Sequence, residues 1–290
     1  MMQPLLSIVI ANYNYGRFLE EAIQSVLRQV DETMCLPSGE RIELIIVDGG
    51  STDNSVEIIK KYADRLAWWC SEKDRGQSHA FNKGFKHATG RFLTWLNADD
   101  LLLPGTIKAL KRVSMRHPTY EWFTGNYLQF SHETRKILFA PWGAHVLPKF
   151  LQTFNAPLMI FGPTTFWSRS AYDKVGAFDE DLHYSMDTDY WLRMKKHGYK
   201  QLRLNHCCWG FRMHDRSKTA QYGTREIEEN VRNRWYQELQ IVNQKVGYKC
   251  APYLRVLGFF MRVLDGSFLV AGYRRLFVVG RSVKLVSGSD

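Results

Sequence analysis

Short apolar runs alternate with segments of helical periodicity over about the first hundred residues of the chain. The apolar runs are rich in Ile, Val, Leu and aromatic residues, which is typical of buried strands; they are Leu5–Ala11, Glu43–Val47, Leu66–Cys70 and Phe92–Leu96. Helical periodicity between them covers Phe18–Gln29, 54–62 and Gln77–Thr89, and Asn54 with Glu57 matches a capping box. This alternation predicts an α/β fold on a doubly wound, mostly parallel sheet.

The pattern changes beyond about residue 120. Tyr120–Ala140 surrounds the turn residues Ser131–Thr134, which predicts a small antiparallel hairpin. A less regular stretch follows to Ser168, and helical periodicity then returns over Ser170–Gly176, Asp187–His197 and Ile227–Val246. We therefore expect a hairpin region after the parallel sheet and a helical C-terminal extension.

Polar residues follow each of the four predicted strands. The segments are Asn12-Tyr13-Asn14, Asp48-Gly49-Gly50-Ser51, Glu72-Lys73-Asp74-Arg75-Gly76 and Asn97-Ala98-Asp99-Asp100. Ligands of open α/β sheets bind beside the carboxyl ends of the strands. Asp, Asn and Gly also make turns, so each segment alone has a structural explanation. All four together favour a polar ligand-binding crevice.

Composition narrows the class of protein. Of 290 residues, 45% are hydrophobic and 23% are charged, which is typical of a globular chain rather than a disordered one. Five cysteines without a C-x-x-C pair argue against a disulfide framework or a zinc knuckle. The N-terminus resembles a strand rather than a signal peptide, and no apolar run has the roughly 18 residues of a membrane span. We expect a cytoplasmic protein that is not integral to a membrane.

Two motifs are candidates for metal binding. Paired carboxylates in Asn97-Ala98-Asp99-Asp100 suit a hard divalent cation, although Asp also suits the start of a helix ahead of Pro104. His214 follows the apolar-aromatic stretch Trp209–Met213. A His at a strand end is a metal ligand, a phosphate contact or simply a polar loop residue.

Asp187 is the candidate for acid–base chemistry. Apolar residues three, four and seven positions later share its face of the predicted helix, so its carboxylate faces inward. A helix N-terminus favours the ionised form, which suits a general base, although an N-cap is an equally good explanation. Asp189 lies on another face, with Arg193 four residues later as an ion-pair partner. We interpret Asp189 as structural.

In their order along the chain, these segments resemble glycosyltransferase family 2, the inverting nucleotide-sugar transferases of the GT-A fold. The matching segments are Ser-Ile-Val-Ile-Ala-Asn-Tyr-Asn (7–14), Ile-Ile-Val-Asp-Gly-Gly-Ser-Thr-Asp-Asn-Ser (45–55), Asp-Arg-Gly-Gln-Ser-His-Ala-Phe-Asn-Lys-Gly (74–84), Ala-Thr-Gly (88–90), Trp-Leu-Asn-Ala-Asp-Asp (95–100), Met-Asp-Thr-Asp-Tyr-Trp-Leu-Arg (186–193) and Phe-Arg-Met-His (211–214). They cover roughly residues 5–215, and the ordered set is far more specific than any one motif.

The resemblance implies roles for the matching positions. Those that would bind the donor nucleotide are Tyr13, Asp48, Asp74, Arg75 and Asn97, with Asp48 on the base. Asp99 would bind a divalent cation, Mn²⁺ or Mg²⁺, that bridges the diphosphate, and His214 would assist the metal or the diphosphate. Asp187 matches the catalytic base, which removes a proton from the acceptor hydroxyl as that oxygen attacks the anomeric carbon.

The chain departs from the family pattern at three places. Asn97 stands where Asp is usual and donates less charge to a metal, and Met186 replaces a common Glu before the base. Val231–Trp235 ends in the Arg-Trp of the Gln-x-x-Arg-Trp motif of processive synthases, but Val replaces the Gln. We interpret that match as chance and expect transfer of a single sugar.

The resemblance also suggests a division of the chain. We expect a GT-A catalytic domain over 1–215, with a nucleotide-sugar-binding half over about 1–117 and an acceptor-binding half over about 118–215. Residues 216–290 form the extension and carry 13 Lys and Arg against 6 Asp and Glu, which is +7 of the net +10. Its segment 253–285 interleaves Arg with apolar residues. That pattern suits either a peripheral contact with the inner face of the cell membrane or a helix packed on the catalytic domain.

The leading prediction is a hexosyltransferase that acts in cell-surface polysaccharide or glycolipid biosynthesis, on a saccharide or lipid-linked saccharide acceptor. The acceptor site is expected within 140–185, where Gly162–Thr165 and Trp167 are either liners or core. A sugar-nucleotide pyrophosphorylase is the alternative enzyme, but its usual Gly-rich basic loop after the first strand is replaced here by Asn-Tyr-Asn-Tyr-Gly. A non-catalytic nucleic-acid-binding or membrane-binding protein leaves the acidic strand ends unexplained, and intact Asp99 and Asp187 argue against an inactive relative. We expect no nucleic-acid partner.

Overall fold

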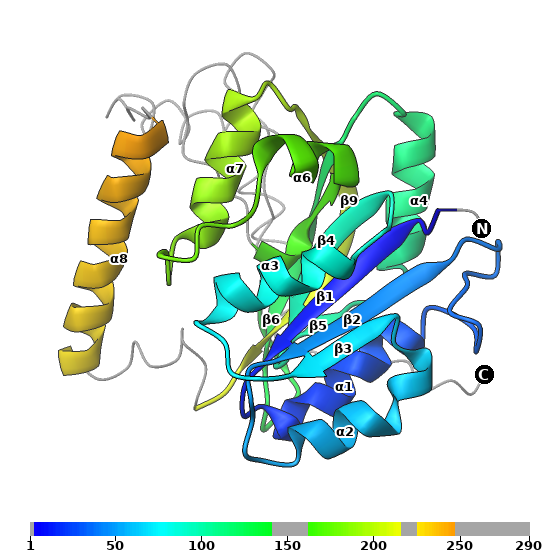
Figure 1. The fold of residues 1–290 in the computed structure, drawn as a ribbon, viewed down its shortest axis with the longest axis horizontal. Helices are drawn as coiled ribbons and strands as arrows, with labels where there is room; N and C mark the ends of the chain where they lie inside the picture. Colours follow the sequence, from blue (N-terminus) through cyan, green and yellow to red (C-terminus); the bar gives the residue numbers. More distant parts are fainter. Residues whose placement is uncertain (1–2, 141–161, 216–224, 247–290) are drawn as a thin grey trace.

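The computed structural model describes residues 3–140, 162–215 and 225–246 (Figure 1). Its strands form one mixed sheet in the order β3-β2-β1-β4-β8-β6-β9-β5, and β7 pairs with the outer part of β6. The predicted amphipathic segment 253–285 and much of the expected acceptor region lie outside the described residues.

Four parallel strands make the N-terminal half of the sheet, as the sequence predicts. They are β1 (Leu6–Asn12), β2 (Ile42–Asp48), β3 (Trp68–Ser71) and β4 (Phe92–Asn97). Asn12 at the end of β1 pairs with Asp48, and Ala11 pairs with Asn97. The polar segments that follow these strands therefore meet at one edge of the sheet.

The C-terminal half of the sheet is mixed. Its strands are β5 (Leu101–Leu102), β6 (Trp122–Ser131), β7 (Ile137–Phe139), β8 (Thr165–Ser168) and β9 (Gln201–Met213). The β6–β7 hairpin is confirmed. β8 runs antiparallel to both β4 and β6, and β9 runs parallel to β6, with register shifts around Asn126. The sequence analysis missed β5, β8 and the first half of β9.

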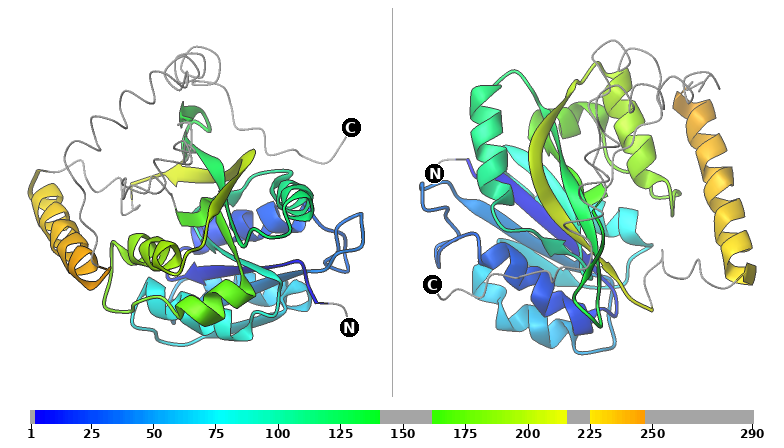
Figure 2. Two further views of the ribbon diagram at one scale, coloured as in Figure 1. Left: turned by 90° about the horizontal axis from the view of Figure 1, so that it is seen from above. Right: turned by 180° about the vertical axis from the view of Figure 1, so that it is seen from behind.

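Helices cover both faces of the sheet (Figures 1 and 2). One apolar cluster joins the sheet to α1 (Gly16–Leu27), α2 (Ser55–Lys61) and α4 (Thr106–Arg116), and the other joins it to α3 (Gln77–His87), α6 (Arg169–Val175) and α7 (Met186–Lys196). Short 3₁₀ helices occupy η1 (Ala63–Arg65) and η2 (Gly162–Thr164). Ile8 and Ile10 of β1 belong to the first cluster and Val9 to the second, as expected for a strand buried on both faces.

The capping box predicted at Asn54 is wrong. Asn54 is the N-cap of α2, but its side chain makes no capping hydrogen bond within the described part of the chain. Asp53 replaces it: its Oδ1 accepts from the Ser55 N–H at 3.0 Å and its Oδ2 from the Gly16 N–H at 2.9 Å. One carboxylate thus joins the starts of α1 and α2, beside the end of β1.

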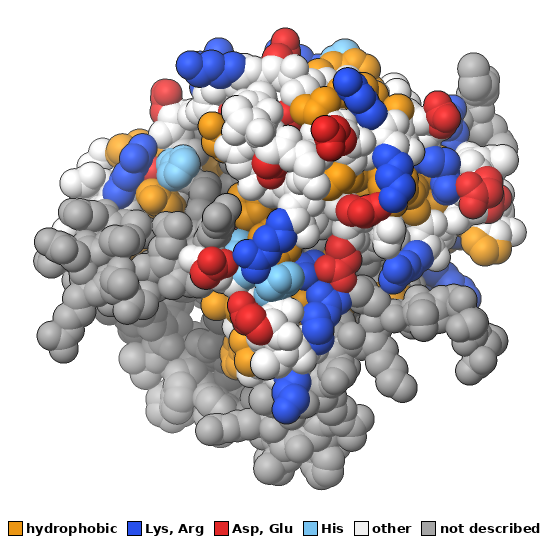
Figure 3. Space-filling model, turned by 90° about the horizontal axis from the view of Figure 1, so that it is seen from below, with side chains coloured by type: hydrophobic (Ala, Val, Ile, Leu, Met, Phe, Trp, Pro, Cys, Tyr) orange, Lys and Arg blue, Asp and Glu red, His pale blue; other side chains and the backbone are white. Residues whose placement is uncertain are grey.

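The last described helix, α8 (Arg225–Val246), lies alongside α7 (Figure 1). Among the described residues, no helix is both long enough and apolar enough to cross a membrane. On the face in Figure 3, Lys and Arg are interspersed with Asp and Glu. This mixture matches the near balance of charge in residues 1–215, which contain 26 basic and 23 acidic side chains.

Candidate active site

A cavity of about 590 Å³ opens where the parallel strands end, and its size falls within the roughly 300–1,000 Å³ of small-molecule sites. Its walls come from the segments after β1 and β3, the end of β4, strands β6 and β9, η2, the start of α7, and α8. The predicted site residues that line it are Tyr13, Asp74, Asn97, Asp99 and Asp187. The structure therefore brings together the predicted nucleotide, metal and base positions.

Tyr13 and Asp74 line this cavity from the segments that follow β1 and β3. Tyr13 is 59% exposed, which leaves its ring free of the core beside the end of β1. The Asp74 Oδ1 atom accepts a hydrogen bond from the Gly76 N–H at 2.8 Å, and its carboxylate packs against Gly49. A Cβ atom at position 49 would lie 2.6 Å from Asp74 Oδ2, so any other residue here would force the Asp74 carboxylate to move.

Asp48 is fully buried beneath the cavity rather than in its wall. Its oxygens accept hydrogen bonds from Asn12 Nδ2 at 2.6 Å and from Ser71 Oγ at 2.6 Å, and also from the backbone and side chain of Ser51. Burial opposes ionisation, but these hydrogen bonds lower the pKa of the Asp48 carboxyl. Here the residue holds the ends of β1, β2 and β3 together, and its contact with a nucleobase stays a prediction.

Arg75 is exposed and forms an ion pair with Glu180. Glu180 also accepts a hydrogen bond from Asn82 Nδ2 at 3.0 Å. Arg75 does not line the cavity, so its predicted role in nucleotide binding is not supported by a contact there.

Asp99 and His214 form the candidate metal site. His214 Nε2 lies 3.1 Å from Asp99 Oδ2, and the buried imidazole packs against the rings of Tyr15 and Phe18. Among the described residues, no group of three or more His, Cys, Asp or Glu side chains could hold a metal. A carboxylate and an imidazole nevertheless fit a Mg²⁺ or Mn²⁺ ion that takes its other ligands from substrate phosphates and water.

The neighbouring carboxylate, Asp100, points away from the cavity. It is fully buried, its Oδ1 accepts from the Arg212 N–H at 2.9 Å, and its Oδ2 accepts from Asn97 Nδ2 at 2.8 Å. Burial and the adjacent Asp99 charge raise the pKa of Asp100 well above its ordinary value. Asn97 Oδ1 also accepts from Gln77 Nε2 at 2.8 Å, so the Asn97 amide links Asp100 to α3.

Arg212 is a supporting residue that the sequence analysis did not single out. Its fully buried guanidinium donates to the Asp99 carbonyl oxygen at 2.6 Å and to Glu21 Oε2 at 2.6 Å. The rings of Phe18 and Phe130 flank it at 5.1 and 5.0 Å. The signal that identifies it is an Arg within the apolar-aromatic stretch just before His214.

Asp187 stands at the first turn of α7, half-buried in the cavity wall. Its Oδ1 accepts from the Thr188 N–H at 2.7 Å. Burial raises the pKa of Asp187 and outweighs the backbone hydrogen bonds that favour ionisation. Trp191 anchors the helix between Trp95 and Trp122, with ring centroids 5.6 and 5.8 Å apart. The base candidate therefore stands on a rigidly packed element.

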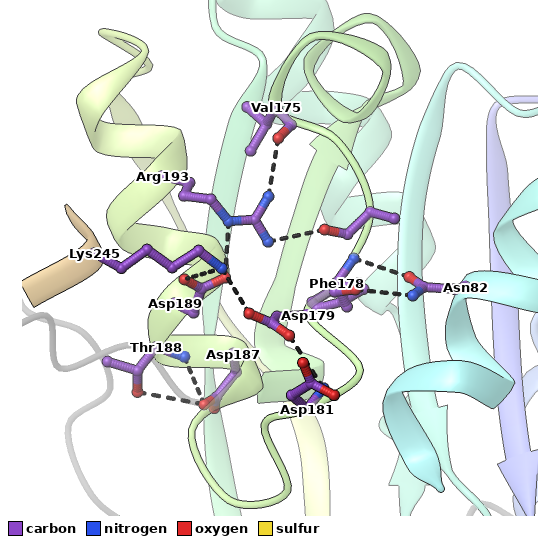
Figure 4. Close-up of polar contacts among 11 residues, drawn as sticks. Asn82, Val175, Phe178, Asp179, Asp181, Asp187, Thr188, Asp189, Arg193 and Lys245 are labelled. Carbon is purple, nitrogen blue, oxygen red and sulfur yellow. Dashed lines mark hydrogen bonds and ion pairs between the residues drawn. The ribbon is translucent and has the colours of Figure 1, made fainter. Parts of the chain in front are cut away.

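Asp189 is structural, as its helical position predicts. Figure 4 shows it directed at Arg193 and Lys245, whereas Asp187 lies beside Thr188. Its buried Oδ2 accepts from Arg193 Nε at 2.7 Å, and the Arg193 guanidinium also donates to the Val175 carbonyl at 2.9 Å. This pair fastens α7 to the end of α6.

Aromatic residues to which the sequence analysis gave no role also line the cavity: they include His183, Tyr184, Trp209, Phe211 and Trp235. Gly162 and Pro163 also line the cavity, whereas Thr164, Thr165 and Trp167 are core. Trp235 belongs to α8 and is part of the Arg-Trp pair interpreted from sequence as a chance match. The structure places it at the site.

The chain belongs to glycosyl transferase family 2, whose model matches residues 7–176. It is similar to an uncharacterized glycosyltransferase of Rickettsia typhi, at 28% identity over 66% of this chain and 58% of the relative. Glycosyltransferase GlyG of Streptococcus pneumoniae is 29% identical over 48% of this chain and 44% of its own length. The matches to these two relatives thus span about half of each relative's length.

Solved structures show that the fold is GT-A-like. Residues 1–349 of S. aureus TarS, in complex with UDP-GlcNAc, have a TM-score of 0.57 and 15% identity, over 79% of this chain and 66% of that TarS chain. The mannosyltransferase PcManGT of Pyrobaculum calidifontis, in complex with GDP-Man and Mn²⁺, has a TM-score of 0.55 and 16% identity, over 96% of this chain and 88% of its own.

Proposed function

We propose that the chain is a metal-dependent, inverting glycosyltransferase that moves a single sugar from a nucleotide-diphosphate sugar to an acceptor hydroxyl. The observation that carries the proposal is that Asp99 and Asp187 line one cavity from different elements, with the buried His214 in contact with Asp99 from behind the cavity wall. A pyrophosphorylase is not proposed, because the chain belongs to glycosyl transferase family 2.

The donor would lie along the ends of the parallel strands. Tyr13 and Asp74 would bind the nucleoside and Asn97 would contact the ribose; the position of all three in the cavity wall supports this. Asp99 and His214 would hold the divalent cation, which neutralises charge on the leaving diphosphate when bound. The complexes of TarS with UDP-GlcNAc and of PcManGT with GDP-Man and Mn²⁺ support a nucleotide-sugar donor and a metal.

Asp187 is proposed as the general base. The acceptor oxygen attacks the anomeric carbon, its proton passes to the Asp187 carboxylate, and the bond from that carbon to the diphosphate oxygen breaks with its electron pair. One displacement inverts the configuration. A raised pKa makes this carboxylate a stronger proton acceptor near neutral pH.

The acceptor would bind on the Asp187 side. Tyr184, three residues before Asp187, and Trp235 of α8 line the cavity with aromatic rings, which suit the C–H faces of a sugar. We propose a saccharide or lipid-linked saccharide acceptor, hexosyl transfer, and a role in cell-surface polysaccharide or glycolipid biosynthesis. A basic 216–290 extension supports a cytoplasmic protein held peripherally at the membrane.

A thermal-shift screen tests the donor and metal together. Uridine, guanosine and thymidine diphosphates are each tested with and without Mn²⁺, on the wild type, on Asp99→Asn and on a surface control, Asp173→Asn. A binding ligand raises the melting temperature by mass action. We expect one diphosphate to stabilise the wild type and Asp173→Asn when Mn²⁺ is present, with the shift lost in Asp99→Asn. An equal shift without metal contradicts the metal site, and no shift with any diphosphate contradicts the donor assignment.

A further inference from the structure

Helix α8 lies beyond the residues that the family model matches, yet it is docked beside the candidate base. Val242 is fully buried within the same apolar cluster as α7. Lys245 forms an ion pair with Asp179 at 2.6 Å, in the loop between α6 and α7 (Figure 4). The C-terminal half of α8 is therefore attached to the element that carries Asp187.

Glu238 makes the central contact of this docking. Only 5% of it is exposed, which is unusual for a carboxylate. Its Oε1 accepts from the His183 N–H at 3.0 Å, and its Oε2 accepts from the N–H groups of Tyr184 and Ser185 at 2.7 and 2.9 Å. One carboxylate thus binds three consecutive backbone donors.

These donors lie directly before the base. Ser185 is the N-cap of α7, its side chain makes no capping hydrogen bond among the described residues, and Asp187 follows two positions later. Glu238 supplies the negative acceptor that a helix N-terminus favours, from 54 residues away in the case of Tyr184. It thereby fixes the backbone conformation from which Asp187 extends.

Other charges do not account for the buried position of Glu238. Arg234, one turn earlier on α8, has its Nε 3.8 Å from Glu238 Oε1, and its side chain is 62% exposed. An ion pair at this distance with a solvent-exposed cation contributes little to stability. The three N–H donors are the interactions that hold the carboxylate in place.

We propose that Glu238 is a positioning residue for Asp187: α8 completes the active site by holding the 183–185 backbone through this carboxylate. The inference rests on the proposed role of Asp187 as the base. It predicts that removing the carboxylate lowers kcat while the nucleotide side of the cavity, built from β1, β3 and β4, stays intact.

The test compares Glu238→Gln and Glu238→Leu with Val242→Ala, which weakens α8 packing but leaves the carboxylate in place. Glu238→Leu removes every acceptor, and a misplacement of about 1 Å can cost on the order of 100-fold in rate. We expect kcat to fall about that much in Glu238→Leu and about tenfold in Glu238→Gln, whose single oxygen cannot serve all three donors. The donor KM and the nucleotide-induced thermal shift should match the wild type. Hydrogen exchange of the 183–185 amides should accelerate in both variants and much less in Val242→Ala.

Two results would overturn the inference: kcat of the Glu238 variants equal to that of Val242→Ala, or protection of the 183–185 amides unchanged. If Glu238→Leu fails to fold, Glu238→Gln decides the question alone, because it keeps the size and packing of the side chain. An Asp187→Asn variant measured alongside separates the two proposals. Full activity in Asp187→Asn contradicts the base assignment, whereas loss in Asp187→Asn with normal Glu238 variants contradicts only the positioning role.

Discussion

Arg212→Met is a stringent test of how the candidate metal site is supported. The guanidinium of Arg212 donates to the Asp99 carbonyl and to Glu21, each at 2.6 Å, between the rings of Phe18 and Phe130. Methionine fills much of the same volume and retains contact with both rings, but it donates no hydrogen bond. The substitution therefore isolates the polar contribution of the residue.

The expected loss of stability in Arg212→Met depends on which partners Asp99 and Glu21 retain. A hydrogen bond from a charged group contributes about 1.5–3 kcal/mol, and the Asp99 carbonyl loses its donor outright. Glu21 keeps Arg135, which binds its other oxygen at 2.5 Å, so the cost stays below the roughly 3–5 kcal/mol of an orphaned buried charge. We expect a loss of about 2–3 kcal/mol in the free energy of unfolding, or about 4–12 °C in the melting temperature.

The assay is denaturant unfolding, followed by a Mn²⁺ titration of the thermal shift produced by the stabilising diphosphate. Arg28→Met, at the exposed C-cap of α1, is the control and should cost less than about 0.5 kcal/mol. Arg212→Met should also require more Mn²⁺, because the Asp99 backbone is no longer held. If Arg212→Met is as stable as Arg28→Met and its thermal shift depends on Mn²⁺ as in the wild type, Arg212 does not hold the Asp99 backbone in place for metal binding.

Three further predictions concern ionisation and close packing. Because burial raises the pKa of Asp187, kcat at saturating substrates should rise with pH, and the apparent pKa of that rise should lie above the ordinary 3.8. An apparent pKa at or below 3.8 would contradict this prediction. The raised pKa of Asp100 means that the native state binds an extra proton above pH 3.8, so its stability contribution is greatest below 3.8 and is lost as pH rises through the folded pKa. Asp100→Asn should flatten that part of the melting-temperature profile, and an unchanged profile would contradict it. Gly49→Ala puts a Cβ 2.6 Å from Asp74 Oδ2 and should displace that carboxylate. Nucleotide affinity measured by calorimetry should fall about tenfold, which is about 1.4 kcal/mol. Unchanged affinity would show that Asp74 does not contribute to nucleotide binding.

The parallel half of the sheet was predictable because each strand is buried on both faces. Such strands appear in sequence as continuous apolar runs between helical segments, as Ile45–Val47 of β2 does. Strand β5 has two residues, and the first half of β9 mixes Arg203 and Asn205 with apolar positions. These strands depend on partners distant in sequence and on register shifts, and no local pattern encodes either.

The sequence was enough to identify the acidic residues of the candidate site, but not the contacts that orient them. Aspartates after the strands and at the start of α7 indicate chemistry, and Arg193 four residues after Asp189 distinguishes the structural carboxylate from Asp187. Which carboxylate of the 99–100 pair faces the cavity depends on Arg212, more than a hundred residues away. The contribution of Glu238 could not be predicted either, because its partners are backbone N–H groups more than 50 residues earlier, which no sequence pattern marks.

The most direct test of the account is the rate of sugar transfer by Asp187→Asn at saturating donor and acceptor, with Asp173→Asn as the control. General-base catalysis contributes on the order of 10²–10⁴-fold, so Asp187→Asn should lose at least about 100-fold in kcat. Its thermal shift with the diphosphate and Mn²⁺ should equal that of the wild type. Transfer by Asp187→Asn at the rate of Asp173→Asn would show that Asp187 is not the base and would contradict the proposed mechanism.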